Sequence, residues 1–249
     1  MKRRLNYRKK ILLLVMLASM KVTAEPLSFM LMKGEGGAQS SKAKLSFEVH
    51  MLESACDVKV SFVNDGINGS GLNFSAKPLS SALIDEKQYE SLVQVRTYKN
   101  YPLTSAVLIK ASTGISEIKS IEGERLSVIS RSSYLGWEVI HKLYSGAETK
   151  LDDKDIYETG GYEGAIALLL HGDVFSAALP GPLARRWLTA NKLTIIAESD
   201  ELSIGEVWVR KQLSEDQKHA CKKALIALER TNRRDKRMDV FPAWVEGFK

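Results

Sequence analysis

The sequence predicts an α/β protein built from mostly parallel sheets flanked by helices. Three observations support this fold class. A strand, a helix and a second strand follow one another over 27–63, a second alternation of strands and helices fills 112–196, and a capped helix follows at 214–230. Strands that alternate with helices are typical of parallel sheets, because the helices form the crossovers between neighbouring strands.

The first strand–helix–strand unit is defined by its hydrophobic pattern. We expect strands at 27–33 and 58–63 and a helix at 40–54 between them. The helix is predicted by two apolar series at three- and four-residue steps: Ala43, Phe47 and Met51, and Leu45, Val49 and Leu52. The Gly-, Asn- and Ser-rich stretch 64–77 is typical of a loop. A short helix at 78–84 and strands at 92–98 and 105–109 follow.

The second alternation predicts a further set of elements. After a short helical or irregular link at 116–121, we expect strands at 126–129, 155–157, 174–179, 193–196 and 206–210, with helices at 133–144, 162–171 and 183–190. The last helix, 214–230, has the clearest start, because Ser214 can act as its N-cap and Gln217 stands at the capping-box position.

The first 24 residues have the pattern of a secretory signal peptide. Basic residues within 2–10 precede the apolar run 11–18, which is short for a membrane span, and Val22-Thr23-Ala24 fits the small-x-small cleavage pattern. We expect cleavage after Ala24 and a protein that is free in the periplasm or secreted. An uncleaved membrane anchor is the alternative.

The positive charge of the chain comes from this segment. The whole chain has 36 Lys and Arg against 30 Asp and Glu, a net charge of +6. Without the seven basic residues of 1–24, the remaining 225 residues have 29 against 30, a net charge of −1. A nucleic-acid-binding function is therefore not expected.

Two cysteines, Cys56 and Cys221, are present, and neither follows the signal in a lipobox position. An oxidising compartment would permit a disulfide between them. Two separate buried thiols remain the alternative, since two cysteines fix no spacing pattern.

A polar loop between a predicted strand and helix is the best candidate for a binding site. Ser130, Arg131, Ser132 and Ser133 follow the strand 126–129, and Tyr134 begins the helix. Hydroxyls, a guanidinium and the free backbone N–H groups of a helix start together favour a small anion. A simple N-cap is the alternative.

A second candidate segment opens the helix 162–171. Gly160 and Gly161 would let a ligand approach the backbone, and Tyr162 would offer a ring and a hydroxyl. A plain glycine turn is the alternative. In the first half of the chain, Lys33, Glu35 and the loop 66–75 could supply further contacts.

Neither a metal centre nor an active site is indicated. The four histidines, at 50, 141, 171 and 219, show no ligand spacing with one another or with the cysteines. The sequence contains neither a Gly-x-Ser-x-Gly motif nor a Cys/His signature of nucleophilic catalysis. We therefore expect a binding protein without cofactor rather than an enzyme.

The stretch from about 121 to 230 resembles the second half of a type 2 periplasmic solute-binding protein of the phosphate/phosphonate-binding branch. Five segments carry the resemblance: 121–128 as a lead into a strand, 130–136 as a Ser-rich anion loop, 160–166 and 171–178 as the starts of a helix and a strand, and 207–214 before the last long helix. Two residues depart from the pattern of the family. Tyr162 replaces a histidine or another polar residue, and Phe175 stands where an aspartate is frequent.

The resemblance implies two α/β lobes with a ligand in the cleft between them and a hinge that closes on it. Lobe 1 would comprise 25–110 and 200–249, lobe 2 would comprise 111–199, and the crossings would lie near 109–112 and 199–205. The last helix would return to lobe 1 and bring Cys221 towards Cys56, which favours the disulfide.

The function implied is that of a monomeric periplasmic protein that binds a small anion bearing a phosphate, phosphonate or carboxylate group. Its expected ligand contacts are Ser130, Arg131, Ser132, Ser133, Tyr134, Gly161 and Tyr162. It would present the ligand to the permease of an ABC transporter. A sensor that signals through a membrane receptor and a dehydratase-like enzyme on the same fold are the alternatives.

Overall fold

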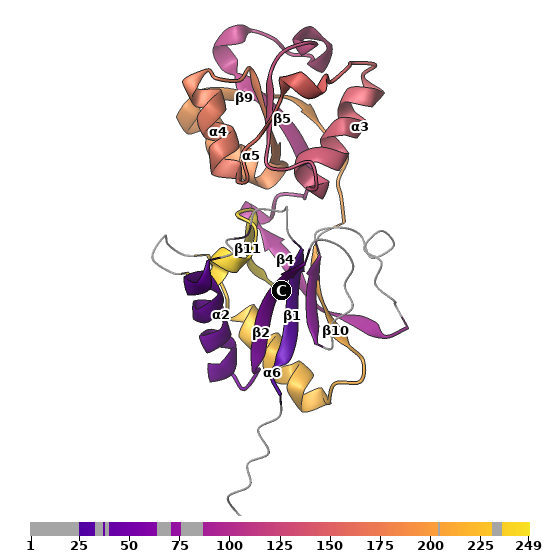
Figure 1. Ribbon diagram of the computed structural model, residues 1–249, viewed down its shortest axis with the longest axis vertical. Coiled ribbons are helices and arrows are strands. Elements are labelled where there is room, and N and C mark those ends of the chain that lie inside the picture. The colour runs from indigo at the N-terminus through magenta and orange to yellow at the C-terminus, as the bar shows by residue number, and fades with distance from the viewer. Residues whose placement is uncertain are drawn as a thin grey trace, which may run out of the picture.

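The protein has two α/β lobes, one above the other in Figure 1. The computed structural model describes residues 25–32, 37, 40–63, 71–75, 87–203, 205–230 and 236–249. The proposed signal peptide 1–24, the short helix expected at 78–84, Lys33 and Glu35 lie outside these residues. Within them, the helices are too short or too polar to cross a lipid bilayer.

The first lobe, at the bottom of Figure 1, is built on a six-stranded sheet with the order β11-β4-β10-β3-β1-β2. Its strands are β1 (Leu27–Met32), β2 (Val58–Val63), β3 (Leu72–Ser75), β4 (Tyr89–Thr97), β10 (Glu206–Arg210) and β11 (Val245–Phe248), and its helices are α2 (Ser41–Glu53) and α6 (Glu215–Ile226). The expected strand–helix–strand unit is confirmed, since β1 and β2 pair in parallel with α2 between them.

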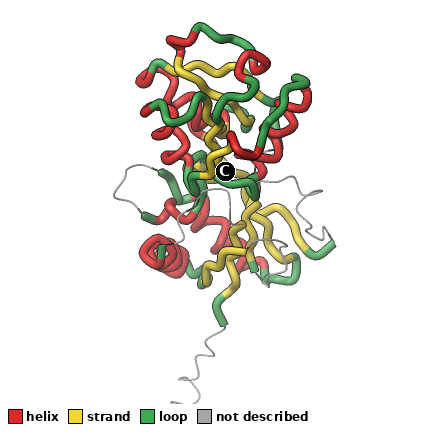
Figure 2. Tube along the Cα trace, turned by 45° about the horizontal axis from the view of Figure 1, so that its top comes forward, coloured by secondary structure: helices red, strands yellow, loops and turns green. Residues whose placement is uncertain are grey.

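The second lobe has a five-stranded sheet with the order β7-β6-β8-β5-β9. Its strands are β5 (Ser105–Lys110), β6 (Leu126–Val128), β7 (Ile156–Glu158), β8 (Ser176–Pro180) and β9 (Leu193–Glu198), and its helices are α3 (Val139–Gly146), α4 (Tyr162–His171) and α5 (Gly181–Asn191). In the turned view of Figure 2, the strands of this lobe lie between its helices.

The chain passes between the sheets twice, at 98–104 and at 199–205. The expected first crossing at 109–112 is wrong, because β5 pairs with β8 and β9 of the second sheet rather than with the strands that precede it. The crossings are joined where they leave the second lobe: Leu202 N donates to Leu103 O at 2.8 Å, and Ser105 N donates to Ser199 Oγ at 3.0 Å. Two crossing segments that are hydrogen-bonded to each other form a hinge between the lobes.

A partly buried ion pair anchors the second lobe at this hinge. Arg185 on α5 donates two hydrogen bonds to the Glu198 carboxylate, at 2.6 and 2.9 Å, and Thr104 donates a third. Although burial raises the pKa of Glu198, these bonds outweigh it and hold the pKa below its usual value. Glu198 is therefore a charged residue that ties the two crossings to α5.

The core of the first lobe depends on the end of the chain. Phe241 packs edge-on against Phe29, Phe47 and Phe74, with ring centroids 5.4 to 5.9 Å apart. Trp244 is fully buried beside Phe74. No strand was expected after the last helix, whereas the structure forms β11 on the edge of β4.

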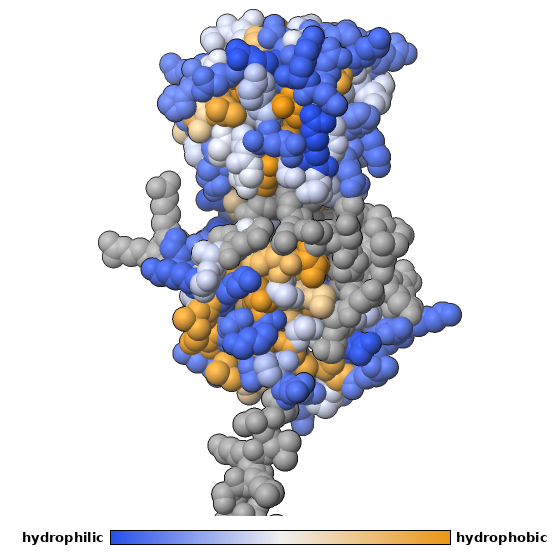
Figure 3. All heavy atoms as spheres, in the orientation of Figure 1, coloured by the Kyte–Doolittle hydropathy of each residue, from blue (hydrophilic) through white to orange (hydrophobic). Residues whose placement is uncertain are grey.

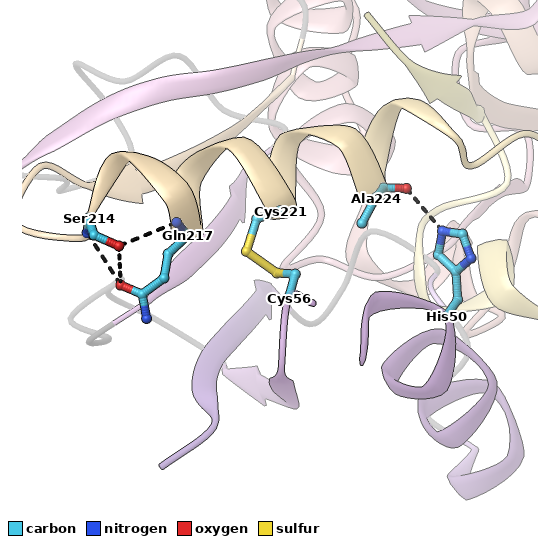
Figure 4. Close-up of a disulfide and its surroundings, with 6 residues drawn as sticks. All are labelled: His50, Cys56, Ser214, Gln217, Cys221 and Ala224. Atoms are coloured by element: carbon cyan, nitrogen blue, oxygen red, sulfur yellow. Dashed lines mark hydrogen bonds between the residues drawn. A yellow bond between two sulfur atoms is a disulfide. The ribbon is translucent and has the colours of Figure 1, made fainter. Parts of the chain in front are cut away.

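The helix α6 attaches the C-terminal part of the first lobe to its N-terminal part (Figure 4). Its capping box is confirmed, with Ser214 accepting from Gln217 N and Gln217 accepting from Ser214 N. The disulfide between Cys56 and Cys221 is also confirmed, and its Cα atoms lie 4.9 Å apart. Beside it, His50 Nε2 donates to Ala224 O at 2.9 Å.

Candidate functional site

The Ser/Arg loop that follows β6 forms the start of a helix, as the sequence predicted. Ser133 is fully buried and caps the turn Tyr134–Glu138, because its hydroxyl accepts a hydrogen bond from Gly136 N at 2.7 Å. Ser130 and Ser132 lie further out, with their hydroxyls 2.9 Å apart. The N-cap interpretation therefore holds for Ser133, while Ser132 is exposed.

Arg131 is engaged by carboxylates of its own lobe. Its Nη1 donates to Asp153 at 2.6 Å, and its Nε lies 3.3 Å from Glu158. Its guanidinium also lies 5.4 Å from the centre of the Trp137 ring. The hydrogen bond to Asp153 raises the pKa of Arg131, so the side chain stays charged but its charge is balanced by two carboxylates.

The structure brings the two predicted loops together at the carboxyl ends of β6 and β7. Gly160 N donates to Ile129 O at 2.8 Å, and Arg131 N donates to the Glu158 carboxylate at 2.9 Å. Gly161 is the N-cap of α4. Parallel strands end at one edge of a sheet, which is where ligands bind in open α/β folds. The two loops therefore lie next to each other at this edge of the second sheet.

Two further residues of the predicted set, besides Ser133, are inside the lobe rather than on this edge. Tyr162 is 1% exposed and Tyr134 is 9% exposed, and both belong to the hydrophobic core. Their rings are therefore closed to a solute in this structure.

A cavity of about 650 Å³ lies between the two lobes. The second lobe contributes Glu163 at the start of α4 and five residues of α5: Leu183, Arg186, Trp187, Ala190 and Asn191. The first lobe contributes Arg230, Lys236, Asp239 and Ala243, which follow α6. The first turn of α4 therefore reaches the cavity, immediately after the predicted Gly161 and Tyr162.

Two cations that line the cavity are each paired with a carboxylate. Arg186 Nη1 donates to Glu246 of β11 at 3.1 Å, and Lys236 Nζ lies 3.1 Å from Asp239. Lys236 and Arg186 remain partly exposed, at 40% and 38% of their side chains. A solute in the cavity could therefore reach both cations.

Arg230 has a different, structural environment. Its Nη2 donates to the carbonyl oxygens of Met238, Phe241 and Pro242 at 2.8 to 3.2 Å, and its Nε donates to Val245 O at 3.0 Å. Burial lowers the pKa of Arg230, against the opposing effect of Asp239. These hydrogen bonds hold the C-terminal segment in place, and this segment forms one wall of the cavity.

Sequence reasoning missed this cavity. Neither the helix expected at 183–190 nor the segment 236–243 was among the expected ligand contacts. No motif joins these segments, because their proximity arises from the return of the chain to the first lobe. Within the described residues, no group of three His, Cys, Asp or Glu could hold a metal ion.

The chain matches the model of the family described as "ABC transporter, phosphonate, periplasmic substrate-binding protein" over residues 75–249. No curated protein matches the chain in sequence.

Solved structures share the two-lobed fold. A binding-protein component of an ABC phosphonate transporter from Pseudomonas aeruginosa has a TM-score of 0.58 at 14% identity, over 91% of this chain and 82% of that one. PhnD1 from Prochlorococcus marinus, in complex with methylphosphonate, has a TM-score of 0.59 at 15% identity, over 90% and 93%. A Xanthomonas citri protein bound to chloride has a TM-score of 0.57 at 10% identity, over 89% and 91%. At these identities the likeness establishes the fold.

Proposed function

This chain belongs to the family of phosphonate ABC-transporter periplasmic substrate-binding proteins, and we propose that it closes on a small anion between its lobes. The anion carries a phosphonate, phosphate or carboxylate group. The protein then presents it to a membrane permease. Proteins of this family bind substrate for a transporter and are not enzymes, so transport is favoured over sensing and over a dehydratase-like activity.

The observation that carries the proposal is the interlobe cavity with its two accessible cations. Arg186 comes from the second lobe and Lys236 from the first. An anion between them would gain charge-assisted hydrogen bonds of about 1.5–3 kcal/mol each. Because the contacts come from both lobes, only the closed arrangement provides all of them, and binding would favour closure.

In this proposal, the two loops predicted from the sequence lie at the edge of the second sheet, beside the cavity. Ser130, Ser132 and Gly161 would offer hydroxyls and backbone to a solute at the edge of the second sheet. Ser133, Tyr134 and Tyr162, which are buried, would hold these loops in place. Arg131 would link the loops through Asp153 and Glu158.

The N-terminal segment completes the proposal. Residues 1–24 would be a signal peptide cleaved after Ala24, and the mature protein would act in the periplasm as a monomer. The family is periplasmic, which agrees with export.

Anion binding tests the function. We expect isothermal titration calorimetry to show saturable binding of methylphosphonate or phosphate, and thermal shift to show stabilisation of RT ln(1 + [L]/Kd). Lys236→Gln should weaken this binding about tenfold, or about 1.4 kcal/mol. Lys222→Gln, on the exposed side of α6, is the matched control and should leave the affinity unchanged. Absence of binding for methylphosphonate, phosphate and acetate alike would rule the function out.

A further inference from the structure

One arginine of the second lobe contacts β11 of the first lobe and the turn that begins the first crossing. Arg186, on α5, donates to Glu246 of β11 at 3.1 Å, and its guanidinium lies 5.0 Å from the centre of the Tyr98 ring. Tyr98 begins the turn η2 (Tyr98–Asn100) that follows β4, and α5 packs against this turn. Glu246 of the first lobe and Tyr98 at the start of the crossing thus contact an edge and the face of one guanidinium.

We propose that Arg186, Glu246 and Tyr98 form an interlobe latch that keeps the empty protein partly closed. The latch rests on the proposed function only for its effect on ligand affinity, because it acts between the lobes with or without a ligand.

The geometry of the three side chains explains why they respond to lobe opening. Glu246 lies in the first lobe, Tyr98 directly follows its strand β4 at the start of the crossing, and Arg186 lies in the second lobe. Separating the lobes would therefore break the ion pair and the ring contact together. Glu246 is only 17% exposed. A shielded ion pair is weakened less by solvent and salt than a fully exposed pair.

The latch is also part of the wall of the cavity. Arg186 lines the interlobe cavity, and its hydrogen bond to Glu246 occupies only the Nη1 group. A planar guanidinium carries five N–H donors, so other donors of Arg186 can reach a solute while the ion pair persists. An anion in the cavity would therefore find Arg186 already oriented. A binding-competent state that is already populated lowers the closure cost that ligand binding must supply.

An ion pair inside one lobe, matched in its arginine, provides the control. Arg96 Nη2 contacts Glu229 at 2.9 Å, and the Arg96 side chain is 36% exposed, close to the 38% of Arg186, while Glu229 is 58% exposed against 17% for Glu246. Both of its residues belong to the first lobe. Glu229→Gln removes the same charge as Glu246→Gln but crosses no lobe boundary.

The test measures the distance between the lobes without ligand. Spin labels at Lys142→Cys on α3 and Gln212→Cys after β10, both exposed positions, report this distance by double electron–electron resonance. We expect Glu246→Gln to raise the ratio of open to closed molecules about two- to fivefold, as for a partly exposed ion pair. Glu229→Gln should leave the distribution as in the wild type. The charge swap Arg186→Glu with Glu246→Arg should move the distribution part of the way back, because it restores the ion pair but not the contact with the Tyr98 ring.

An unchanged distribution in Glu246→Gln, or an equal change in Glu229→Gln, would overturn the latch. Methylphosphonate is then added in a separate measurement. If no anion binds but Glu246→Gln opens the lobes, the proposed function fails and the latch stands. If anions bind and Glu246→Gln leaves the lobes unmoved, the function stands and the latch fails.

Discussion

The arginines near the cleft show that residue type alone does not identify a ligand contact. Arg131 is balanced by Asp153 and Glu158, and Arg230 is bound by backbone carbonyl oxygens. Arg186 has one carboxylate and one ring as partners and lines the cavity. A guanidinium whose charge is already offset gains less from a new anion, since the anion must compete with the existing carboxylates.

Replacing Arg131 tests this reasoning at a single residue. A direct contact with the anion would make Arg131→Ala bind methylphosphonate at least about tenfold more weakly. The two ion pairs of Arg131 argue for a smaller loss, and we expect less than about threefold by calorimetry, against about tenfold for Lys236→Gln. A tenfold loss in Arg131→Ala would return this side chain to the set of direct ligand contacts.

At the scale of elements, the accuracy of the sequence-based predictions follows from where the stabilising contacts lie. The elements β2, α4 and β10 begin and end as predicted, because their patterns are local. The short strands β3 and β11 were missed, since each is defined by pairing with a distant partner: β3 with β1 and β10, and β11 with β4. The cavity lies beyond sequence reasoning for the same reason.

The helix α2 illustrates what periodicity leaves open. Both of its apolar series have helical spacing, but only the series with Ala43, Phe47 and Met51 is buried. Leu45, Val49 and Leu52 are 45–61% exposed, and apolar side chains are visible at the surface where α2 lies in Figure 3. Which series faces the core is decided by the sheet and by Phe241, which contacts Phe47.

Substitutions on the two faces of α2 should therefore differ in cost. We expect Phe47→Ala to lower the free energy of unfolding by about 3–5 kcal/mol, because it opens a cavity in a packed aromatic cluster. Leu52→Gln should change this free energy by less than about 0.5 kcal/mol, since its side chain is already 56% exposed. Urea unfolding followed by circular dichroism measures both. A large loss in Leu52→Gln would show that the outer face is covered in solution.

At the scale of the whole molecule, the two lobes differ in how many stretches of chain form them. The second lobe is one stretch of chain, from β5 to β9, whereas the first is assembled from both ends of the described chain. The disulfide between Cys56 and Cys221 spans 165 residues and encloses the whole second lobe. It therefore ties together the two separate parts of the first lobe.

Removing this disulfide should destabilise the first lobe selectively. The cross-link limits the entropy of a long loop in the unfolded chain, and loss of a native disulfide typically costs about 2–5 kcal/mol. We expect Cys56→Ser with Cys221→Ser to lower the melting temperature and to increase hydrogen exchange in β1, β2 and α6. The strands β6 and β8, which close within the continuous lobe, should keep their protection. Equal loss of protection in both lobes would instead show that they unfold as one cooperative unit, because the hinge and α5 couple them more strongly than the disulfide stabilises the first lobe.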